Sequence, residues 1–336
     1  MTNSEIVLSL AAAALAALVS ALLTVIVRPM LLRVALAKPN PRSSHRIPTP
    51  QGGGIAVIGA TLIAAGAFIA LTGTSAIQVP LAVFGATLFI AAVGFADDLR
   101  SLPILPRLLL QGLAVAIIVF MAPDKLHIIP AVPFWIERAL LLIAGLWFVN
   151  LVNFMDGLDL MTVAEVVPVT GGVVLLGWLG ELPALTTIVA AALCGALIGF
   201  SPFNRPVARI FLGDVGSLPI GLLLGWCLLQ LAFHQQFAAA LLLPLYYLMD
   251  ATVTLCRRLM RREPFWAAHR SHFYQRATDN GFTVWRVVSE VFMLNIGLAI
   301  MAVVSTMTGS SIIRILLLVL GCIAVTGAMV RFTRPR

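Results

Sequence analysis

Apolar stretches of about 20 residues, separated by short polar loops, recur along the whole sequence. A bilayer core about 30 Å thick needs about 20 helical residues to cross it, so each stretch is long enough to span a membrane. Hydrophobic residues make up 60% of the chain and charged residues 11%, whereas about a quarter of a soluble domain is charged. The chain is therefore expected to be solvated by lipid. Because lipid offers the backbone no hydrogen-bonding partner, the spans must be helices.

The sequence predicts an all-α, polytopic integral membrane protein with about eleven transmembrane helices. The eleven runs cover residues 6–27, 54–71, 79–96, 105–121, 134–152, 160–179, 185–200, 218–233, 237–256, 284–306 and 311–330. No loop between them is long enough for a soluble domain, so residues 1–336 are expected to form a single transmembrane domain.

Positive charge is distributed unevenly between the two sides of this predicted bundle. Of the 22 Lys and Arg residues, all but Lys125, Arg138 and Arg314 lie in or beside the loops on one side. Basic loops mark the cytoplasmic side of a membrane protein, which predicts a periplasmic N-terminus and a cytoplasmic C-terminus. Since the basic residues occupy these short loops, the net charge of +8 does not indicate a nucleic-acid partner.

Two adjacent carboxylates, Asp97 and Asp98, stand where the third run ends, in the segment FADDLRSLPILPR. Successive helical residues point about 100° apart, so the two acids are expected to have different partners. One could serve a Mg²⁺ ion and the other a nucleophile as proton acceptor. The alternative is a solvated helix end.

The segment NFMDGLDLM closes the fifth run and places polar residues at every third position. If the helix continued, Asn153, Asp156 and Asp159 would lie along one face. Gly157 would let a ligand approach the backbone. A simple polar turn is the alternative.

The segment NRPVARIFLGDVGSLPIG precedes the eighth run. Asp214 lies between Gly213 and Gly216 and is a candidate ligand for Mg²⁺, which prefers oxygen donors. Phe211 could stack on a base, although a lone Phe in a membrane protein more often faces lipid.

Two further inner segments, RSSHRIPTPQGGG and HRSHFYQR, combine basic side chains with glycine or aromatic residues. Both could contact phosphate, and both could instead be solvated basic loops. The second holds His269, Arg270, His272 and Arg276. No third ligand of the zinc type is adjacent to its histidines.

Almost all of these polar residues are predicted to lie at the inner boundary of the membrane. A secondary transporter has its binding site near the midplane, and it remains an alternative with the inner cluster as a gate. The inner position favours an enzyme that meets a water-soluble substrate from the cytoplasm and a lipid substrate from the membrane.

Together, in this order, the segments resemble the polyprenyl-phosphate N-acetylhexosamine-1-phosphate transferases (glycosyltransferase family 4), and the first and last look closest to the branch that initiates O-antigen synthesis. The resemblance implies a bacterial inner-membrane enzyme with its active site on cytoplasmic loops. By that resemblance Asp97 and Asp98 are the catalytic pair, and Asp214, with Asp98, holds Mg²⁺, for which Mn²⁺ can substitute. The implied substrate-binding residues are Arg46, Asn153, Asp156, Gly157, Asp159, Asn204, Phe211, His269, Arg270, His272 and Arg276.

The resemblance implies transfer of N-acetylhexosamine-1-phosphate from a UDP-sugar to undecaprenyl or another polyprenyl phosphate, with release of UMP. The expected partners are UDP-N-acetylhexosamine, the lipid phosphate and the bilayer; a homodimer is left open. Two departures from the family pattern stand out: Ser101 replaces the last acid of DDxxD, and HRSH replaces DRxHxHH. The second suggests a different sugar and argues against the alternative within the family, a phospho-N-acetylmuramoyl-pentapeptide transferase.

Overall fold

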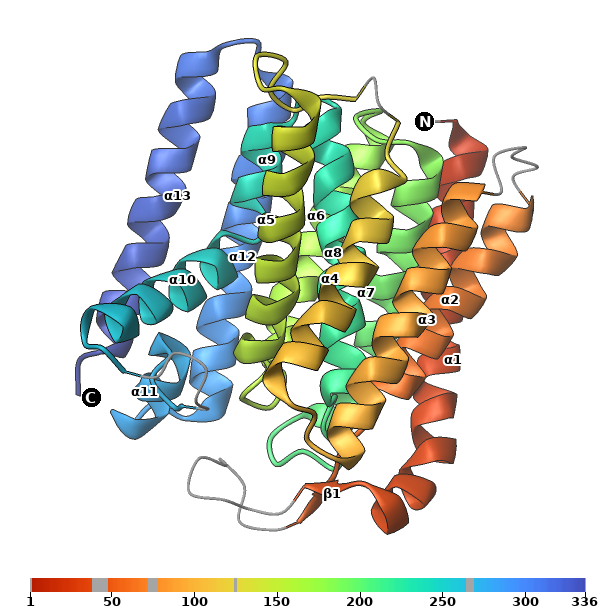
Figure 1. Cartoon of the computed structure of the whole chain (residues 1–336), viewed down its shortest axis with the longest axis vertical. Coiled ribbons are helices and arrows are strands. Elements are labelled where there is room, and N and C mark those ends of the chain that lie inside the picture. Colours follow the sequence, from red (N-terminus) through yellow and green to blue (C-terminus); the bar gives the residue numbers. More distant parts are fainter. Residues whose placement is uncertain (1, 38–47, 72–77, 124–125, 264–268, 336) are drawn as a thin grey trace.

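A bundle of long helices makes up most of the computed structural model, which describes residues 2–37, 48–71, 78–123, 126–263 and 269–335 (Figure 1). The long helices are α1 (Asn3–Val34), α2 (Gly54–Leu71), α3 (Gln78–Leu99), α4 (Ile104–Phe120), α5 (Phe134–Met155), α6 (Met161–Trp178), α7 (Ala184–Asn204), α8 (Asp214–Phe233), α10 (Leu245–Met260), α12 (Val284–Met307) and α13 (Ser311–Phe332). The short elements are β1 (Leu36–Ala37), β2 (Thr49–Pro50), α9 (Phe237–Leu242) and α11 (Phe273–Asp279).

The predicted all-α membrane fold is confirmed. Within the described residues nine helices are long and apolar enough to cross a bilayer, and α4 is a shorter apolar helix of 17 residues. The two termini lie towards opposite ends of the bundle (Figure 1).

Helix α8 lies at the centre of the bundle. In its most apolar 18-residue window 83% of the residues are buried, against 17% for α13 at the periphery. A residue pattern that is apolar on every side is typical of such a central helix. Most of α8 is therefore enclosed by neighbouring helices, while Asp214 at its N-terminus stays partly exposed.

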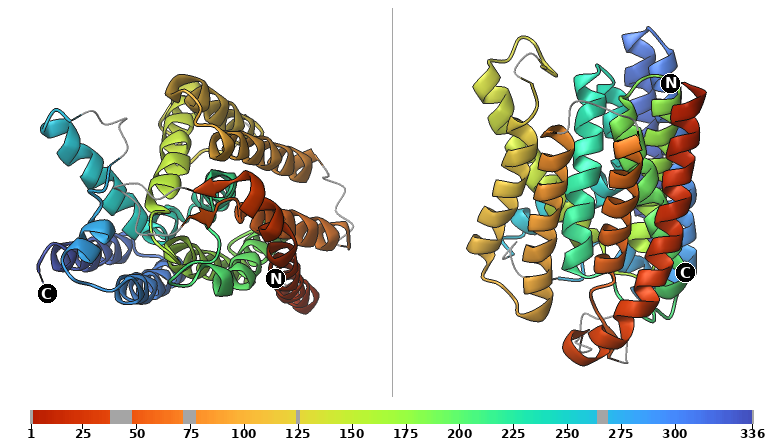
Figure 2. Two further views of the ribbon diagram at one scale, coloured as in Figure 1. Left: turned by 90° about the horizontal axis from the view of Figure 1, so that it is seen from below. Right: turned by 90° about the vertical axis from the view of Figure 1, so that its right-hand side faces the viewer.

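The predicted run at 237–256 is wrong as a single span. The chain forms the short helix α9, turns at Pro244, and resumes as α10, which slants away from the bundle (Figures 1 and 2). Proline donates no backbone hydrogen bond, which favours a break. Helix α10 also buries Asp250, so its apolar residues do not form the uniform surface of a lipid-facing span.

Close backbone approaches fix where α8 begins. A Cβ atom on Gly94 of α3 would lie 2.2 Å from the Asp214 carbonyl oxygen, and one on Gly54 would lie 2.1 Å from the Gly216 Cα. Any side chain at these positions would push α2 or α3 away. The glycines thus bring three helix ends together at one point.

Candidate active site

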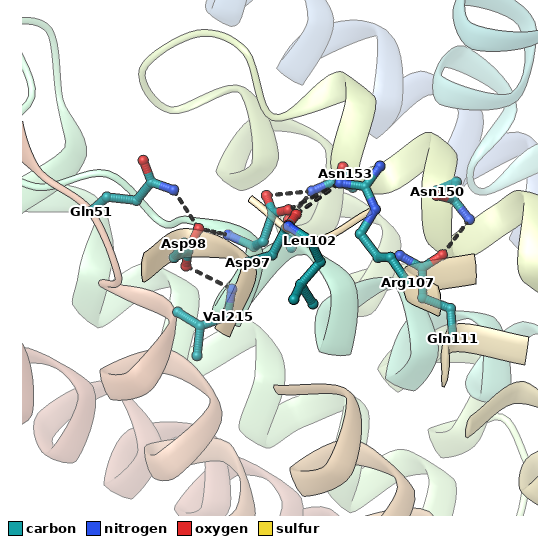
Figure 3. Close-up of polar contacts among 11 residues, drawn as sticks. Gln51, Asp97, Asp98, Leu102, Arg107, Gln111, Asn150, Asn153 and Val215 are labelled. Atoms are coloured by element: carbon teal, nitrogen blue, oxygen red, sulfur yellow. Dashed lines mark hydrogen bonds and ion pairs between the residues drawn. The ribbon is translucent and has the colours of Figure 1, made fainter. Parts of the chain in front are cut away.

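Asp98, at the end of α3, caps the N-terminus of α8. Its two carboxylate oxygens accept hydrogen bonds from the backbone N–H groups of Asp214 (2.8 Å) and Val215 (3.0 Å), and the Gln51 amide donates a third (Figure 3). The first N–H groups of a helix lack partners within the helix and carry partial positive charge, so a carboxylate is well placed there. Asp98 therefore joins α3, α8 and the loop before α2.

Asp97 points the other way, as the sequence predicted for adjacent acids. It accepts a hydrogen bond from the Leu102 backbone N–H (2.6 Å) and forms an ion pair with Arg107 of α4 (2.8 Å) (Figure 3). The Arg107 guanidinium also lies 3.9 Å from the Asp214 carboxylate, while its Nε atom is buried without a partner.

Asp214 is held by Asn153, whose side-chain amide donates to it at 2.7 Å and to the Ser217 hydroxyl at 2.9 Å. The carboxylates of Asp97 and Asp214 lie within hydrogen-bonding reach of each other. Two carboxylates this close repel unless a proton or a cation lies between them. In the described part of the chain, Arg107 is the one basic side chain that an ion pair joins to this cluster.

The donor set of this cluster fits Mg²⁺. Mg²⁺ commonly binds one or two carboxylates and fills its other positions with water and substrate phosphates. Asp97 and Asp214 offer two such carboxylates, whereas the described residues contain no group of three or more His, Cys, Asp or Glu side chains of the kind that zinc requires. Asp98 is a weaker candidate ligand than predicted, because both its oxygens already accept backbone hydrogen bonds.

The expectation that Asn153, Asp156 and Asp159 line one helical face is wrong. Helix α5 ends at Met155, and Asp156 leaves the helical conformation with φ −84° and ψ 44°. Asn153 reaches Asp214, Asp156 accepts from the Thr162 hydroxyl, and Asp159 accepts from the Ala208 backbone N–H at 3.1 Å. The three side chains therefore have three different partners around the end of α5 and the turn that follows it.

The turn at 156–160 is held in a strained conformation by Asn204. Leu160 has a φ of 61°, which non-glycine residues rarely adopt. The Asn204 side chain accepts from the Leu160 N–H (2.8 Å) and donates to the Ile210 carbonyl (3.0 Å). Asn204, implied by resemblance to contact the nucleotide, is thus buried as a link between two loops.

Asp156 lies in the turn itself, and its pKa is raised to about 7. Burial is the main cause, and the nearby charges of Asp98 and Asp159 add to it, while the hydrogen bond from Thr162 lowers the pKa. The Asp156 carboxyl is therefore partly protonated near neutral pH.

The HRSHFYQR segment packs on the same turn. The Tyr274 hydroxyl donates to the Phe154 carbonyl at 3.1 Å, and a Cβ atom on Gly157 would lie 2.3 Å from that hydroxyl oxygen. Gly157 therefore makes room for Tyr274 in this structure. Burial and the negative charges of Asp250 and Asp156 raise the pKa of Tyr274 well above its usual value.

The basic residues of this segment differ in their contacts. Arg270 donates to Thr278 (2.9 Å) and pairs with Asp279 (3.2 Å), so it folds back on α11. No hydrogen bond or ion pair within the described residues involves the Arg276 side chain. His269 accepts or donates at the Ser271 hydroxyl (2.8 Å), and its ring lies 4.8 Å from that of His272.

The loop before α2 runs beside the segment before α8. The Phe211 carbonyl accepts from the N–H groups of Gly52 (3.2 Å) and Gly53 (2.8 Å), and the Phe211 N–H donates to Pro50. Phe211 is thus anchored through its backbone next to the cluster. Arg46 lies outside the described residues.

Several residues of the site escaped the sequence analysis as functional candidates: Gln51, Arg107, Thr162, Ser217 and Asp250. Gln51 and Ser217 act through partners 47 and 64 positions away, Asp98 and Asn153. Arg107 and Thr162 lie 10 and 6 positions from their partners, Asp97 and Asp156. For Asp250 the available signal was an acid inside an apolar run, which is costly unless it is paired.

Comparison with known proteins agrees with this geometry. Residues 80–232 match the model of glycosyl transferase family 4. The chain is 28% identical to the probable undecaprenyl-phosphate N-acetylglucosaminyl 1-phosphate transferase of Bacillus subtilis, over 85% of this chain and 83% of that protein. It is 27% identical to the decaprenyl-phosphate N-acetylglucosaminephosphotransferase of Mycobacterium tuberculosis, over 77% and 72% of the two chains.

A third relative has a name that states a different activity. The chain is 28% identical to the phospho-N-acetylmuramoyl-pentapeptide-transferase of Shouchella clausii, over 89% of this chain and 95% of that protein. The matched segment at 80–232 contains Asp97, Asp98, Asn153 and Asp214, the residues that the structure brings together. These findings confirm the resemblance predicted from the motifs: residues 80–232 match glycosyl transferase family 4, and the similar proteins along most of the chain are sugar-phosphate transferases by name.

Proposed function

We propose that this protein transfers N-acetylhexosamine-1-phosphate from a UDP-sugar to undecaprenyl or a related polyprenyl phosphate and releases UMP. The observation that carries the proposal is the facing pair of Asp97 and Asp214, to which Arg107 is the one basic side chain joined by an ion pair among the described residues. An apolar cavity begins about one helical turn from Asn153, which contacts Asp214, and from Ser217, which contacts Asn153. Phosphoryl transfer depends mainly on positioning and on neutralising charge. A cluster of this composition suits the binding of phosphates together with a divalent cation.

The cavity suits the hydrocarbon part of the acceptor. It has a volume of about 240 Å³ and is lined by apolar residues of α4, α5, α8, α9 and α10. On three of these helices the lining begins one turn from a polar residue near the cluster: Val115 lies four positions from Gln111, Val149 from Asn153, and Gly221 from Ser217. A lipid phosphate whose first isoprene units occupy the cavity would therefore have its phosphate beside the acids.

We propose a different role for each residue around the cluster. We assign the metal to Asp214 and Asp97, and the placement of α8 to Asp98, in preference to a metal ligand at Asp98. A bound Mg²⁺ ion supplies charge neutralisation at the donor's pyrophosphate. Arg107 adds fixed positive charge, and Asn153 orients the Asp214 carboxylate. The acceptor phosphate is largely ionised at pH 7, so a proton acceptor, for which Asp97 is the candidate, adds a modest gain.

The donor is placed against the turn at 156–160 and the two segments that pack beside it. Phe211 and the turn offer an aromatic ring and hydrogen-bonding groups, which suits a uracil base. His269, His272 and Arg276 belong to the segment whose Tyr274 contacts Gly157, and we assign them to the sugar end of the donor. We propose that the reacting phosphorus lies between these two parts of the donor, next to Asp214.

The orientation follows from the charge distribution. We propose that the acid cluster faces the cytoplasm of a bacterial inner membrane, with the N-terminus in the periplasm and the C-terminus in the cytoplasm. The product would start O-antigen or a related envelope glycan, and a homodimer remains compatible with the proposal.

A second candidate within the family uses UDP-N-acetylmuramoyl-pentapeptide as the donor. The pentapeptide transferase of Shouchella clausii matches this chain along more of its own length than the Bacillus relative does. The departure of the HRSH segment from DRxHxHH favours the smaller donor instead.

The test is a donor panel. Purified protein in lipid nanodiscs receives Mg²⁺, undecaprenyl phosphate and, separately, UDP-N-acetylglucosamine, UDP-N-acetylgalactosamine or UDP-N-acetylmuramoyl-pentapeptide, and UMP release is measured with the lipid product. We expect lipid-dependent UMP release from one of the first two donors. Turnover of the pentapeptide donor alone would favour the second candidate, and no lipid-dependent UMP with any donor would contradict both.

A further inference from the structure

Asp250 is a fully buried carboxylate on α10 that the transfer scheme above does not use. Five donors surround it. Its Oδ1 faces His272 Nδ1 (3.2 Å), the Phe273 N–H (3.0 Å) and the Thr254 hydroxyl (3.3 Å), and its Oδ2 accepts from the Tyr246 hydroxyl (3.1 Å) and the Tyr274 N–H (3.2 Å). An ionised carboxylate can only accept hydrogen bonds. This environment therefore satisfies a charged Asp250 without a metal or a bound ligand.

The contact with His272 decides which ring nitrogen carries the proton. Because Asp250 accepts, Nδ1 must be the protonated nitrogen, and in the neutral ring Nε2 is then an acceptor. The His272 side chain is 4% exposed and its ring stacks on that of Tyr274, with centroids 5.8 Å apart. No described residue forms a hydrogen bond to its Nε2. The ring is thus fixed in orientation, with one acceptor unused.

The same carboxylate also fixes where that acceptor lies. Through the N–H groups of Phe273 and Tyr274 it holds the first turn of α11. Tyr274 in turn donates to the Phe154 carbonyl and touches Gly157 in the proposed donor-binding turn. Asp250 therefore connects α10, His272 and the turn in one chain of hydrogen bonds.

We propose that Asp250 is a positioning residue that keeps His272 in the Nδ1-protonated form, so that Nε2 accepts a hydrogen bond from a hydroxyl or amide N–H of the donor sugar. The inference rests on the proposed function for the identity of that donor. An unprotonated nitrogen would repel phosphate oxygens, so the sugar's hydrogen-bond donors are its chemically matched partners. His272 then contributes to the choice of sugar, and Asp250 acts only through it.

The tautomer can be measured without any turnover. We would label the histidines of the full-length protein with ¹⁵N and record ring-nitrogen shifts at pH 8 in nanodiscs. The chain has five histidines, so His272→Gln identifies the signals of His272 by their loss. We expect Nδ1 protonated and Nε2 unprotonated in the wild type, and the reverse in Asp250→Asn, whose amide can donate to Nδ1. A wild-type His272 protonated at Nε2, or a tautomer unchanged in Asp250→Asn, would overturn the proposal.

Kinetics then separate positioning from general damage. Asp250→Asn is expected to raise the KM for the UDP-sugar by about tenfold, the size of one lost substrate hydrogen bond, with the KM for undecaprenyl phosphate unchanged. Tyr246→Phe is the matched control, because it removes one donor to Asp250 and leaves His272 in place; it should keep the wild-type tautomer and stay within about twofold in KM. Equal increases in both KM values in Asp250→Asn, or a reversed tautomer in Tyr246→Phe, would contradict the proposal.

The outcomes distinguish this inference from the proposed function. If the wild type releases no UMP with any UDP-sugar, the proposed function fails, while the wild-type ¹⁵N shifts still decide whether Asp250 sets the tautomer. If Asp250→Asn does not fold, the wild-type tautomer and the donor-specific KM effect of His272→Gln remain as the test. A His272→Gln variant with unchanged donor KM would then overturn the role of His272 in sugar binding.

Discussion

Asp98 and Asp250 both cap the N-terminus of a helix, in two different regions of the molecule. The first region is the cluster of Asp97, Asp98 and Asp214, and the second is the surroundings of Asp250 and α11. Each of the two capping acids lies on one helix and accepts two successive backbone N–H groups at the start of another helix, α8 for Asp98 and α11 for Asp250. A carboxylate in this place satisfies N–H groups that have no partner within the helix and interacts favourably with the helix dipole.

The two regions differ in the charged or polar residue at the N-terminus of the capped helix. Helix α8 starts with Asp214, so capping brings further negative charge beside Asp98, and Asp97 adds more. Helix α11 follows His272, whose Nδ1 lies 3.2 Å from a carboxylate oxygen of Asp250. The first region gathers three carboxylates around one arginine, and we propose that it binds a cation, whereas in the second region the Asp250 carboxylate is surrounded by hydrogen-bond donors of the protein itself.

The largest effect should come from removing charge in the first region. Asp214→Asn takes away one of two facing carboxylates and should lower the rate of UMP release by about 100-fold or more, since losing a metal's ligand costs several kcal/mol. The melting temperature should stay near that of the wild type, because Asn153 can still hydrogen-bond to the new side chain. Near-normal turnover would contradict the assignment of Asp214.

Substitutions of the two neighbouring acids should have different effects: loss of Asp97 should mainly lower activity, and loss of Asp98 should mainly lower stability. Asp98→Asn places an amide N–H against backbone N–H groups of α8 and should lower stability by about 1–2 kcal/mol, the usual effect of losing a helix cap. Asp97→Asn keeps an acceptor for the Leu102 N–H and should lower activity with a smaller loss of stability. Thermal unfolding and UMP release on both variants check this.

The reverse pattern, with Asp97→Asn the less stable protein, would show that the two adjacent acids have exchanged roles. A tryptophan-fluorescence or light-scattering melt can be run on both variants in the same detergent, so the two melting temperatures are directly comparable.

A smaller effect should distinguish two arginines of the second region. Arg276 has no ion pair within the described residues, whereas Arg270 is engaged with Thr278 and Asp279. Arg276→Ala should raise the KM for the UDP-sugar by about tenfold, as expected for one charge-assisted hydrogen bond. Arg270→Ala should change it by about twofold, because exposed ion pairs contribute little. A larger KM increase for Arg270→Ala than for Arg276→Ala would contradict this assignment.

The smallest effect concerns stability and pH at the turn between the two regions. The pKa of Asp156 rises from 3.8 in the unfolded chain to about 7 in the fold, so the folded state binds the extra proton between these values. Stability therefore falls as pH rises through this window. Asp156→Asn removes the effect and should raise the melting temperature at pH 8 by roughly 2 °C or more, with little change at pH 4. An equal shift at both pH values would contradict the raised pKa.

The sequence alone predicts the class of fold well, because lipid imposes long apolar helices that can be counted directly. The break between α9 and α10 escaped it, since residues 237–256 are apolar enough for a span and only the burial of Asp250 and the turn at Pro244 reveal the change of direction. Composition cannot show that an apolar run changes direction in space.

The sequence predicted which residues belong to the candidate site better than it predicted how they are arranged. Asp97, Asp98, Asn153 and Asp214 do gather at one end, but the spacing of Asn153, Asp156 and Asp159 suggested a helical face that the end of α5 at Met155 removes. Contacts such as Gln51 with Asp98 depend on how distant loops pack, and no local pattern specifies them.

The central claim is that Asp97 and Asp214 share one divalent cation, and metal binding tests it most directly. Mn²⁺ is titrated into the full-length protein in nanodiscs without substrate, and the free ion is measured by electron paramagnetic resonance. We predict one Mn²⁺ site per chain that Mg²⁺ displaces, a site lost in Asp214→Asn and retained in Asp250→Asn. Equal Mn²⁺ binding by the wild type and Asp214→Asn would contradict the account.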